Sequence, residues 1–404
     1  MAHVCTAGLI VSLLMVSTSA RAATPTFKTQ EIDKTLKIGY AVSLVDINAD
    51  GKPDIVVVDK DRVIWFENPT WKMRTIMSGQ KSLDNVCLDP YDIDGDGQID
   101  LALGAGWKPG NTKDASTLQW YRRGKTLDDP WEMHAIKYDE PTLHRMRWAD
   151  LDGSGKKVLI TTPLTGRGST SAKNWSEAGV RMQIRHVPAD PTSPDWPTEL
   201  ITDALHVPHN FQVINVSGEK RPEILVASYE GVSLLSKAAG GQSWDITHLG
   251  EGDQSKPNTN RGSSEIKLGK LKGGTRYIAT IEPWHGNQVV VYTQAAGAKD
   301  WKRQVLDSQL LWGHAVWCSD LDGDGDDELV IGVRDPLAGK AQSGVRVYKA
   351  TDAAGEKWDK SELDPGGVAV EDLAVADLNG DGKPDIVAVG RKTGNVRIYW
   401  NEAK

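Results

Sequence analysis

Hydrophobic and polar positions along the chain repeat in a fixed order. A short apolar segment is followed by a tight loop rich in Asp and Gly, and then by a second segment rich in β-branched residues. Apolar runs bounded by such loops predict β-strands. The copies of this unit begin at Asp46, Asp92, Asp150, Ile214, Leu268, Asp320 and Asp377. Each is followed by one more short apolar strand, as in VIWFEN, LQWYRR and VRIYWN.

A second signature gives the same count of repeats. An aromatic residue stands five positions before an apolar one, at the start of a further strand. The pairs are Trp71 with Ile76, Trp131 with Ile136, Trp196 with Ile201, Trp244 with Leu249, Trp301 with Leu306, Trp358 with Leu363, and Phe27 with Ile32. The last of these pairs precedes the first Asp loop, so the N-terminal segment supplies the outer strand of the final repeat.

Seven repeats of four strands predict an all-β fold, a seven-bladed β-propeller over residues 25–404 that is closed by an N-terminal outer strand. Closure of the ring leaves no open sheet ends between first and last blade. The repeats account for this whole range, so no second domain is predicted. Residues 1–22 predict a signal peptide, because an apolar run over residues 7–16 precedes an Ala20-Arg21-Ala22 cleavage pattern. We therefore expect a secreted or periplasmic protein without a lipid-anchored Cys.

Composition narrows the possible partners. The formal net charge is −8, so there is no global basic field to attract nucleic acid or an anionic membrane. No apolar run is long enough to span a bilayer. The chain has 15 Trp beside 3 Phe, which is typical of a repeated packing position or of sugar-stacking surfaces. A carbohydrate is the expected ligand, and nothing in the sequence specifies an oligomeric state.

The Asp loops resemble FG-GAP/VCBS propeller repeats, and the resemblance extends over the whole predicted propeller. Oxygen atoms at positions 1, 3, 5 and 9 of a tight loop suit a hard cation such as Ca²⁺ or Mg²⁺. The same carboxylates also shape a hairpin by accepting backbone N–H groups without a metal, and the sequence leaves both readings open. Four loops carry the full set: Asp46, Asn48, Asp50 and Asp54; Asp92, Asp94, Asp96 and Asp100; Asp320, Asp322, Asp324 and Glu328; Asp377, Asn379, Asp381 and Asp385.

The positions of four histidines carry the functional prediction. His144, His209 and His314 each lie six residues before the first position of an Asp loop or its counterpart. Six strand residues rise about 20 Å, so these side chains stand at the opposite end of the innermost strand. His285 lies in a loop that opens on the same face. Four imidazoles that converge at one mouth of the central channel suit Zn²⁺ with an open position for substrate.

Other polar and aromatic side chains are predicted on the same face as these histidines. The candidates for substrate binding are Arg145, Arg147, Arg334, Glu371, Tyr40, Trp107 and Trp284. The candidates for proton transfer are Glu282, Tyr229 and Glu230, in the loops of blades four and five.

Around the histidines the chain resembles the propeller domain of the fungal aldos-2-ulose dehydratases, also called 1,5-anhydrofructose dehydratases. The matching stretches are PTLHRMRWADLDG, VPHNF, IEPWHGNQVVVY and WGHAVWCSDLDGDGDDELVIG. The resemblance implies a zinc ion at the base of the propeller cleft and elimination of water from keto sugars. Family members also carry cupin and lectin-like domains, so we expect any step assigned to a cupin site to be absent here.

On this resemblance, His209, His285 and His314 are the expected zinc ligands, and His144 is a fourth ligand or an acid/base. Zinc would acidify the C–H next to a sugar carbonyl, a base would remove the proton, and an acid would assist the leaving group. The reverse hydration uses the same groups. Two other classes stay open: a polysaccharide lyase acting on uronic acids, and a non-catalytic propeller that binds carbohydrate or protein. A shared metal on the four histidines distinguishes the enzymes from the binding module.

Overall fold

The computed structural model describes residues 25–79, 84–218, 221–238, 241, 243–334 and 342–403. The predicted signal peptide over residues 1–22 lies outside these residues. One short 3-10 turn, η1 (Ser171–Lys173), interrupts an otherwise all-β structure in the described residues, and none of its helical segments is long and apolar enough to cross a membrane.

The described strands come in groups of four along the chain. The strands of blades one to three are β2 (Gly39–Val45), β3 (Asp54–Asp59), β4 (Arg62–Glu67), β5 (Lys72–Ser78); β6 (Asp84–Tyr91), β7 (Asp100–Trp107), β8 (Thr117–Arg122), β9 (Glu132–Ile136); β10 (Leu143–Ala149), β11 (Val158–Pro163), β12 (Met182–Arg185) and β13 (Thr198–Thr202). Those of blades four to seven are β14 (Asn210–Ile214), β15 (Glu223–Ser228), β16 (Gly231–Lys237), β17 (Trp244–Gly250); β18 (Ile266–Lys270), β19 (Arg276–Glu282), β20 (Gln288–Gln294), β21 (Lys302–Asp307); β22 (Gly313–Ser319), β23 (Glu328–Val333), β24 (Gly344–Ala350), β25 (Trp358–Pro365); β26 (Val370–Ala376), β27 (Asp385–Gly390), β28 (Val396–Asn401) and β1 (Phe27–Asp33).

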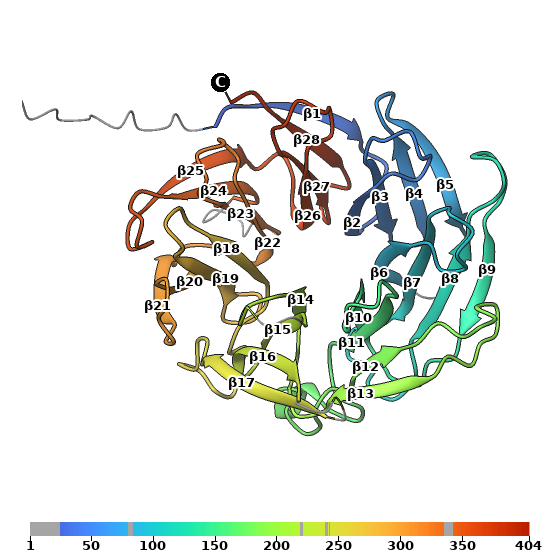
Figure 1. The fold of residues 1–404 in the computed structure, drawn as a ribbon, viewed down its shortest axis with the longest axis horizontal. Helices are drawn as coiled ribbons and strands as arrows, with labels where there is room; N and C mark the ends of the chain where they lie inside the picture. The colour runs from blue at the N-terminus through green and yellow to red at the C-terminus, as the bar shows by residue number, and fades with distance from the viewer. Residues whose placement is uncertain are drawn as a thin grey trace, which may run out of the picture.

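These strands form seven antiparallel four-stranded sheets arranged in a ring, as Figure 1 shows. The first strand of each blade lies innermost and lines the central channel. The last blade has the order β1-β28-β27-β26, so its outer strand comes from the N-terminal end of the described chain. Phe27 pairs with Asn401 and Gln30 with Ile398 in this contact. The prediction of a seven-bladed propeller closed by an N-terminal strand is confirmed.

The second strand is fully buried in four of the described blades. β3, β15, β23 and β27 are buried at every position, because neighbouring blades cover both faces of each sheet. This explains why these strands read as continuous apolar runs rather than as alternating ones. The apolar clusters lie between adjacent blades; one of them joins Val57 of blade one to Val387 of blade seven.

The Asp loops lie together at one end of the channel, where each loop joins the first and second strands of its blade. The carboxylates at the ninth position are fully buried and accept backbone N–H groups. Asp100 accepts from Ile93 and Arg123, and Asp385 accepts from Leu378 and Asn401. Asp54 is held in the same way by Ile47 and Asn68. The ninth position therefore fastens the loop to the blade with or without a cation.

Two of the four complete loops contain a basic side chain of their own. In blade six, the Lys349 ammonium contacts Asp322, lies 2.8 Å from Asp324 Oδ2 and lies 3.5 Å from Glu328 Oε1. In blade two, Arg122 Nε donates to Asp94 Oδ2 at 2.7 Å. The equivalent positions are Glu67 in blade one and Trp400 in blade seven. A basic side chain of the protein thus contacts the loop carboxylates in blades two and six. The sequence pattern did not predict this arrangement.

Candidate functional site

Four consecutive blades each bring one histidine to the channel at the end opposite to the Asp loops. His144 and His314 are the second residues of the inner strands β10 and β22. His209 directly precedes β14, and His285 lies in the turn between β19 and β20. Inner strands line the channel in a propeller, so the shared register of His144, His209 and His314 places these three rings close together, and the turn that carries His285 brings its ring to the same place.

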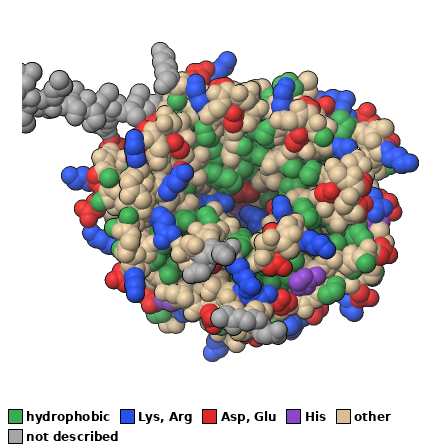
Figure 2. Space-filling view, in the orientation of Figure 1, with side chains coloured by type: hydrophobic (Ala, Val, Ile, Leu, Met, Phe, Trp, Pro, Cys, Tyr) green, Lys and Arg blue, Asp and Glu red, His purple; other side chains and the backbone are tan. Residues whose placement is uncertain are grey.

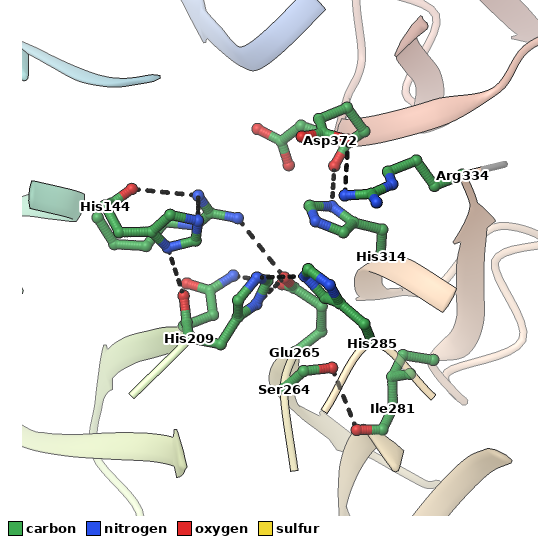
Figure 3. Close-up of polar contacts among 12 residues, drawn as sticks. His144, His209, Ser264, Glu265, Ile281, His285, His314, Arg334 and Asp372 are labelled. Atoms are coloured by element: carbon green, nitrogen blue, oxygen red, sulfur yellow. Dashed lines mark hydrogen bonds and ion pairs between the residues drawn. The ribbon is translucent and has the colours of Figure 1, made fainter. Parts of the chain in front are cut away.

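Three of the four rings share a common centre, as Figure 3 shows. One ring nitrogen from each of His209, His285 and His314 lies within 4.8 Å of the others. The Nε2 atoms of His209 and His285 face each other at 2.9 Å. This separation and the use of three neutral imidazoles fit the first coordination shell of a transition-metal ion such as Zn²⁺.

The opposite nitrogens of two of these rings lie close to oxygens, for His314 in a hydrogen bond and for His209 in a close contact without hydrogen-bond geometry. His314 Nδ1 lies 2.6 Å from the backbone oxygen of Glu371. His209 Nδ1 lies 2.8 Å from Oε1 of the buried Glu265. A carboxylate or carbonyl on the outer nitrogen fixes the ring orientation and leaves Nε2 for a metal. The outer nitrogens of His209 and His314 thus face oxygens, and the Nε2 atoms of these two rings are left for another partner.

His144 is not part of the three-histidine group, and its two ring nitrogens contact other protein groups. Its Nδ1 lies 3.1 Å from the backbone oxygen of His209, and its Nε2 lies 3.3 Å from Nη1 of Arg145. The ring packs 4.6 Å from His209, measured between centroids. This places His144 beside the three-histidine centre rather than inside it.

All four imidazoles are held in the neutral form. Burial lowers the pKa of His144, His209, His285 and His314 well below the usual value, and nearby arginines lower the pKa further. A neutral imidazole offers a lone pair to a metal, whereas an imidazolium does not.

His144, His285 and His314 line a cavity of about 270 Å³ with aromatic walls, and His209 lies fully buried behind them. The walls include four tryptophans: Trp107, Trp175, Trp284 and Trp312. The Trp284 ring stacks on His285 with centroids 4.1 Å apart, so this indole is partly used in holding the ring. Trp312 is 36% exposed and remains open at the rim. Flat indole faces in a polar cavity suit the stacking of a sugar ring.

Several residues with strained backbone conformations lie around this cavity. Non-glycine residues with a left-handed φ line the cavity at five positions: Thr142, Trp175, Val207, His285 and Trp312. Such conformations cost about 1–3 kcal/mol each and persist where the surrounding structure holds them, often at functional sites. The fold therefore maintains this local geometry against a cost.

The polar wall of the cavity combines one carboxylate with three arginines among the described lining residues. Arg391 Nη1 donates to Glu371 Oε1 at 2.7 Å, and Arg334 Nη1 lies 3.6 Å from Oε2. Burial raises the pKa of Glu371, while the two guanidinium groups oppose this rise. Arg145 is the third arginine. Tyr40 also lines the cavity and donates to Asp84 Oδ2 at 2.7 Å.

Glu282 does not reach this cavity, although it was a predicted proton-transfer residue. Its Oε1 accepts from Thr280, Ser263 and Tyr292, and its Oε2 accepts from Arg303. The carboxylate is fully buried and its oxygens are occupied, so it acts as a structural anchor of blade five.

Three further predicted site residues also lie elsewhere. Glu230 binds His206 through the ring and the backbone. The Tyr229 hydroxyl donates to Asn174, and its ring packs behind Trp284. Arg147 lies farther down the channel, because it is three residues beyond His144 on an inner strand. The predicted residues Arg145, Arg334, Glu371, Tyr40, Trp107 and Trp284 do line the cavity.

Two site residues were missed from the sequence, Glu265 and Arg391. Arg391 directly follows the second strand of blade seven, which is the register of Arg334 in blade six, so alignment of the repeats contained the signal. Glu265 precedes β18 in the repeat that has lost its Asp loop, and no motif marks it.

Fold and repeats together define the class: the chain is a seven-bladed β-propeller with FG-GAP-like repeats, which match over residues 46–103 and 320–388. It resembles the propeller of one enzyme family, because the model described as "Aldos-2-ulose dehydratase, beta-propeller domain" matches residues 115–295. That segment contains His144, His209 and His285.

Among curated proteins, the chain is 27% identical over 291 residues to aldos-2-ulose dehydratase of Phanerodontia chrysosporium. The match covers 66% of this chain and 31% of the relative, so the chain spans about a third of that enzyme.

Solved structures show the fold alone. A lectin of Agrocybe aegerita described as recognising non-reducing terminal N-acetylglucosamine is 13% identical, with a TM-score of 0.53 over 91% of this chain and 87% of the lectin. A chain of a mitotic checkpoint complex is 10% identical, with a TM-score of 0.56 over 98% of this chain and 100% of that chain.

Proposed function

We propose that this protein is a zinc-dependent carbohydrate lyase of the dehydratase type, which carries out β-elimination on keto sugars at the mouth of the propeller channel. The observation that carries the proposal is the grouping of His209, His285 and His314 beneath a tryptophan-lined cavity. The similarity to the propeller of aldos-2-ulose dehydratase supports a carbohydrate as the substrate.

The residues present fit a zinc ion. The three histidines offer neutral ring nitrogens, and Glu265 is positioned to support His209 as an outer carboxylate. Zinc bound there would supply Lewis-acid polarisation of a sugar carbonyl. In this proposal, side chains of the cavity wall accept and donate the protons.

Glu371 is the proposed proton acceptor. It is the carboxylate among the described residues that line the cavity, and its Oε2 accepts no hydrogen bond from them. Burial raises its pKa, which makes the carboxylate a better base than an exposed one. Arg334 and Arg391 hold the side chain in place. His144, next to Arg145, faces the same cavity and is the proposed donor to the leaving oxygen.

The tryptophan walls would hold the sugar ring flat over the histidines and exclude water from it. In the secreted enzyme this arrangement would admit one sugar ring at a time, since the cavity holds about 270 Å³. Dehydration and the reverse hydration use the same groups and are not separated by the geometry.

The test combines metal analysis with turnover. Purified protein should contain about one zinc per chain by mass spectrometry, and it should convert 1,5-anhydrofructose to a conjugated enone with ultraviolet absorbance. His285→Ala should lose zinc and turnover together. Glu371→Gln should keep zinc while kcat falls about 100-fold or more. Zinc-free protein from gentle purification that also fails to bind added zinc would overturn the proposal.

A further inference from the structure

A second cavity lies in the same channel, in the half nearer the Asp loops. It has a volume of about 280 Å³ and is lined by inner-strand residues of several blades. We call it the lower chamber. Its charged lining residues are Asp89 of β6, Arg145 and Arg147 of β10, Lys267 of β18 and Asp372 of β26. Figure 2 shows one face of the ring hollowed at its centre, with basic and acidic atoms at the bottom.

The two carboxylates of the lower chamber are already used by backbone donors. Asp89 Oδ2 accepts from the Trp148 N–H at 2.6 Å. Asp372 Oδ2 accepts from the Val42 N–H at 3.0 Å, and its Oδ1 accepts from its neighbour Leu373. The bonds to Trp148 and Val42 connect adjacent inner strands, so these carboxylates stabilise the packing of neighbouring blades.

Two of the three cations of the lower chamber, Lys267 and Arg147, are not used in the same way. Within the described residues, the Lys267 ammonium makes no hydrogen bond or close ion pair; it lies 4.1 Å from the Trp317 ring centroid. Arg147 donates from Nη1 to the backbone oxygen of Met146 and forms no close ion pair. An ammonium has three donors and a guanidinium five, so most donors here lack a protein acceptor.

Lys267 and Arg147 are both half-buried, and a partly desolvated cation without an acceptor is costly unless a ligand supplies one. The chamber offers N–H donors from two basic side chains, one aromatic wall, and carboxylates that face the backbone. Three cations line the chamber beside two carboxylates that already accept backbone N–H groups, so this composition favours an anion over a metal ion. Arg147 presents a planar fork that fits two oxygens of one ligand.

We propose that the lower chamber binds a small oxyanion, with inorganic phosphate as its representative, between Lys267 and Arg147. This site is separate from the histidine centre: the two cavities share Arg145 as a common wall, but Arg147 and Lys267 line the lower chamber alone. The inference does not depend on the proposed lyase activity, and its test needs no turnover.

The first experiment is calorimetric titration of zinc-free, chelator-treated protein with sodium phosphate, and separately with acetate, at constant ionic strength. The wild type should show saturable binding of at least one of the two. Lys267→Met and Arg147→Met should each weaken that binding about tenfold or more, because each removes one charge-assisted contact. Lys302→Met is the matched control. Lys302 is an exposed lysine on the outer strand β21, and it pairs with Glu356.

Absence of saturable binding to the wild type, or equal binding by the wild type and both chamber variants, would overturn the proposal. A second measurement uses only the wild type, so it does not rely on folding of the variants. Phosphate should slow acetylation of Lys267 by acetic anhydride, read by peptide mass spectrometry, and should leave Lys302 unaffected. Equal acetylation of Lys267 with and without phosphate would also contradict the site.

Discussion

At the scale of single residues, the candidate site depends on which atoms of each side chain are already occupied. His144 shares the sequence register of His209 and His314, yet one of its nitrogens contacts the backbone of His209 and the other contacts Arg145. Glu265 was not predicted as a site residue, yet it lies 2.8 Å from His209. Such differences separate the three grouped histidines from the residues that contact them.

Glu265→Gln should weaken zinc binding about 10- to 100-fold, because the neutral amide no longer supports the outer nitrogen of His209 as a carboxylate does. Zinc affinity is measured by competition with a chelating dye. Glu230→Gln is the matched control, since that carboxylate binds His206 outside the cavity and its loss should leave zinc affinity unchanged. Equal affinities for wild type and Glu265→Gln would show that this carboxylate plays no supporting role.

The Lys267→Met variant should be more stable than the wild type at neutral pH, and this difference in stability should shrink in alkaline solution. Burial lowers the pKa of Lys267 from 10.5 to about 8. Below about pH 8 the ammonium is charged in both states, and its burial costs up to about 3 kcal/mol. Between about pH 8 and pH 10.5 the folded state releases the proton first, so wild-type stability rises relative to the variant. Urea unfolding in chloride buffer at several pH values measures the difference.

A constant difference between the wild type and Lys267→Met across this pH range would show that the Lys267 pKa is not lowered by folding. Exposed Lys302→Met provides the reference, because its stability should not depend on pH in this window.

At the scale of elements, the four Asp loops are alike in sequence and unlike in their surroundings. The loop of blade six receives Lys349 from strand β24, and the loop of blade two receives Arg122 from β8. The loops of blades one and seven have Glu67 and Trp400 at the same position. The third strand of each blade therefore determines whether its loop has an internal cation.

Lys349→Met should make blade six depend on an added divalent cation. The substitution leaves Asp322, Asp324 and the buried Glu328 without their shared ammonium, and should cost about 2 kcal/mol in chelator. Calcium should restore part of this loss by taking the position of the ammonium. The melting temperature is compared with and without calcium for this variant, the wild type and Lys360→Met, which lies on the outer strand β25. A calcium response no larger than that of the wild type would contradict the role of Lys349.

At the scale of the whole molecule, the ring is closed by the pairing of β1 with β28. Trp400 Nε1 also donates to Gln30 at 2.8 Å, and Asn395 donates to Glu31 at 2.7 Å across the same contact. A propeller without this closure would expose the edge of β28 and loosen the contact between the first and last blades. The site lies on the axis of the ring, so its geometry depends on closure.

A chain that begins at residue 36 lacks β1 and should aggregate or melt at lower temperature than a chain that begins at residue 25. The physical reason is the loss of six residue pairings together with an unpaired strand edge. Light scattering and calorimetry measure both effects. Zinc content that falls in parallel would connect ring closure to the histidine centre, and an equally stable, monomeric shorter chain would contradict the role of β1.

The sequence by itself determined the number of blades, the closing strand and the register that gathers the histidines. These features repeat along the sequence, because equivalent positions in every blade have the same packing requirements. The register of His144, His209 and His314 was therefore visible without a structure. The direction of individual side chains was not, which is why Glu282, Glu230, Tyr229 and Arg147 were placed in a cavity that they do not line.

Only the tertiary structure decided which partners each polar group meets. Glu282 lies three residues before His285 in the chain, but Arg303 of the outer strand β21 of the same blade donates to its carboxylate. Lys349 contacts the carboxylates of the blade-six loop, although it lies about 25 residues away from them in the chain. Arg334 and Arg391 belong to different blades, yet both contact the carboxylate of Glu371. Such contacts depend on the rotation and spacing of whole blades, which no local pattern records, whereas strand periodicity is a property of the chain itself.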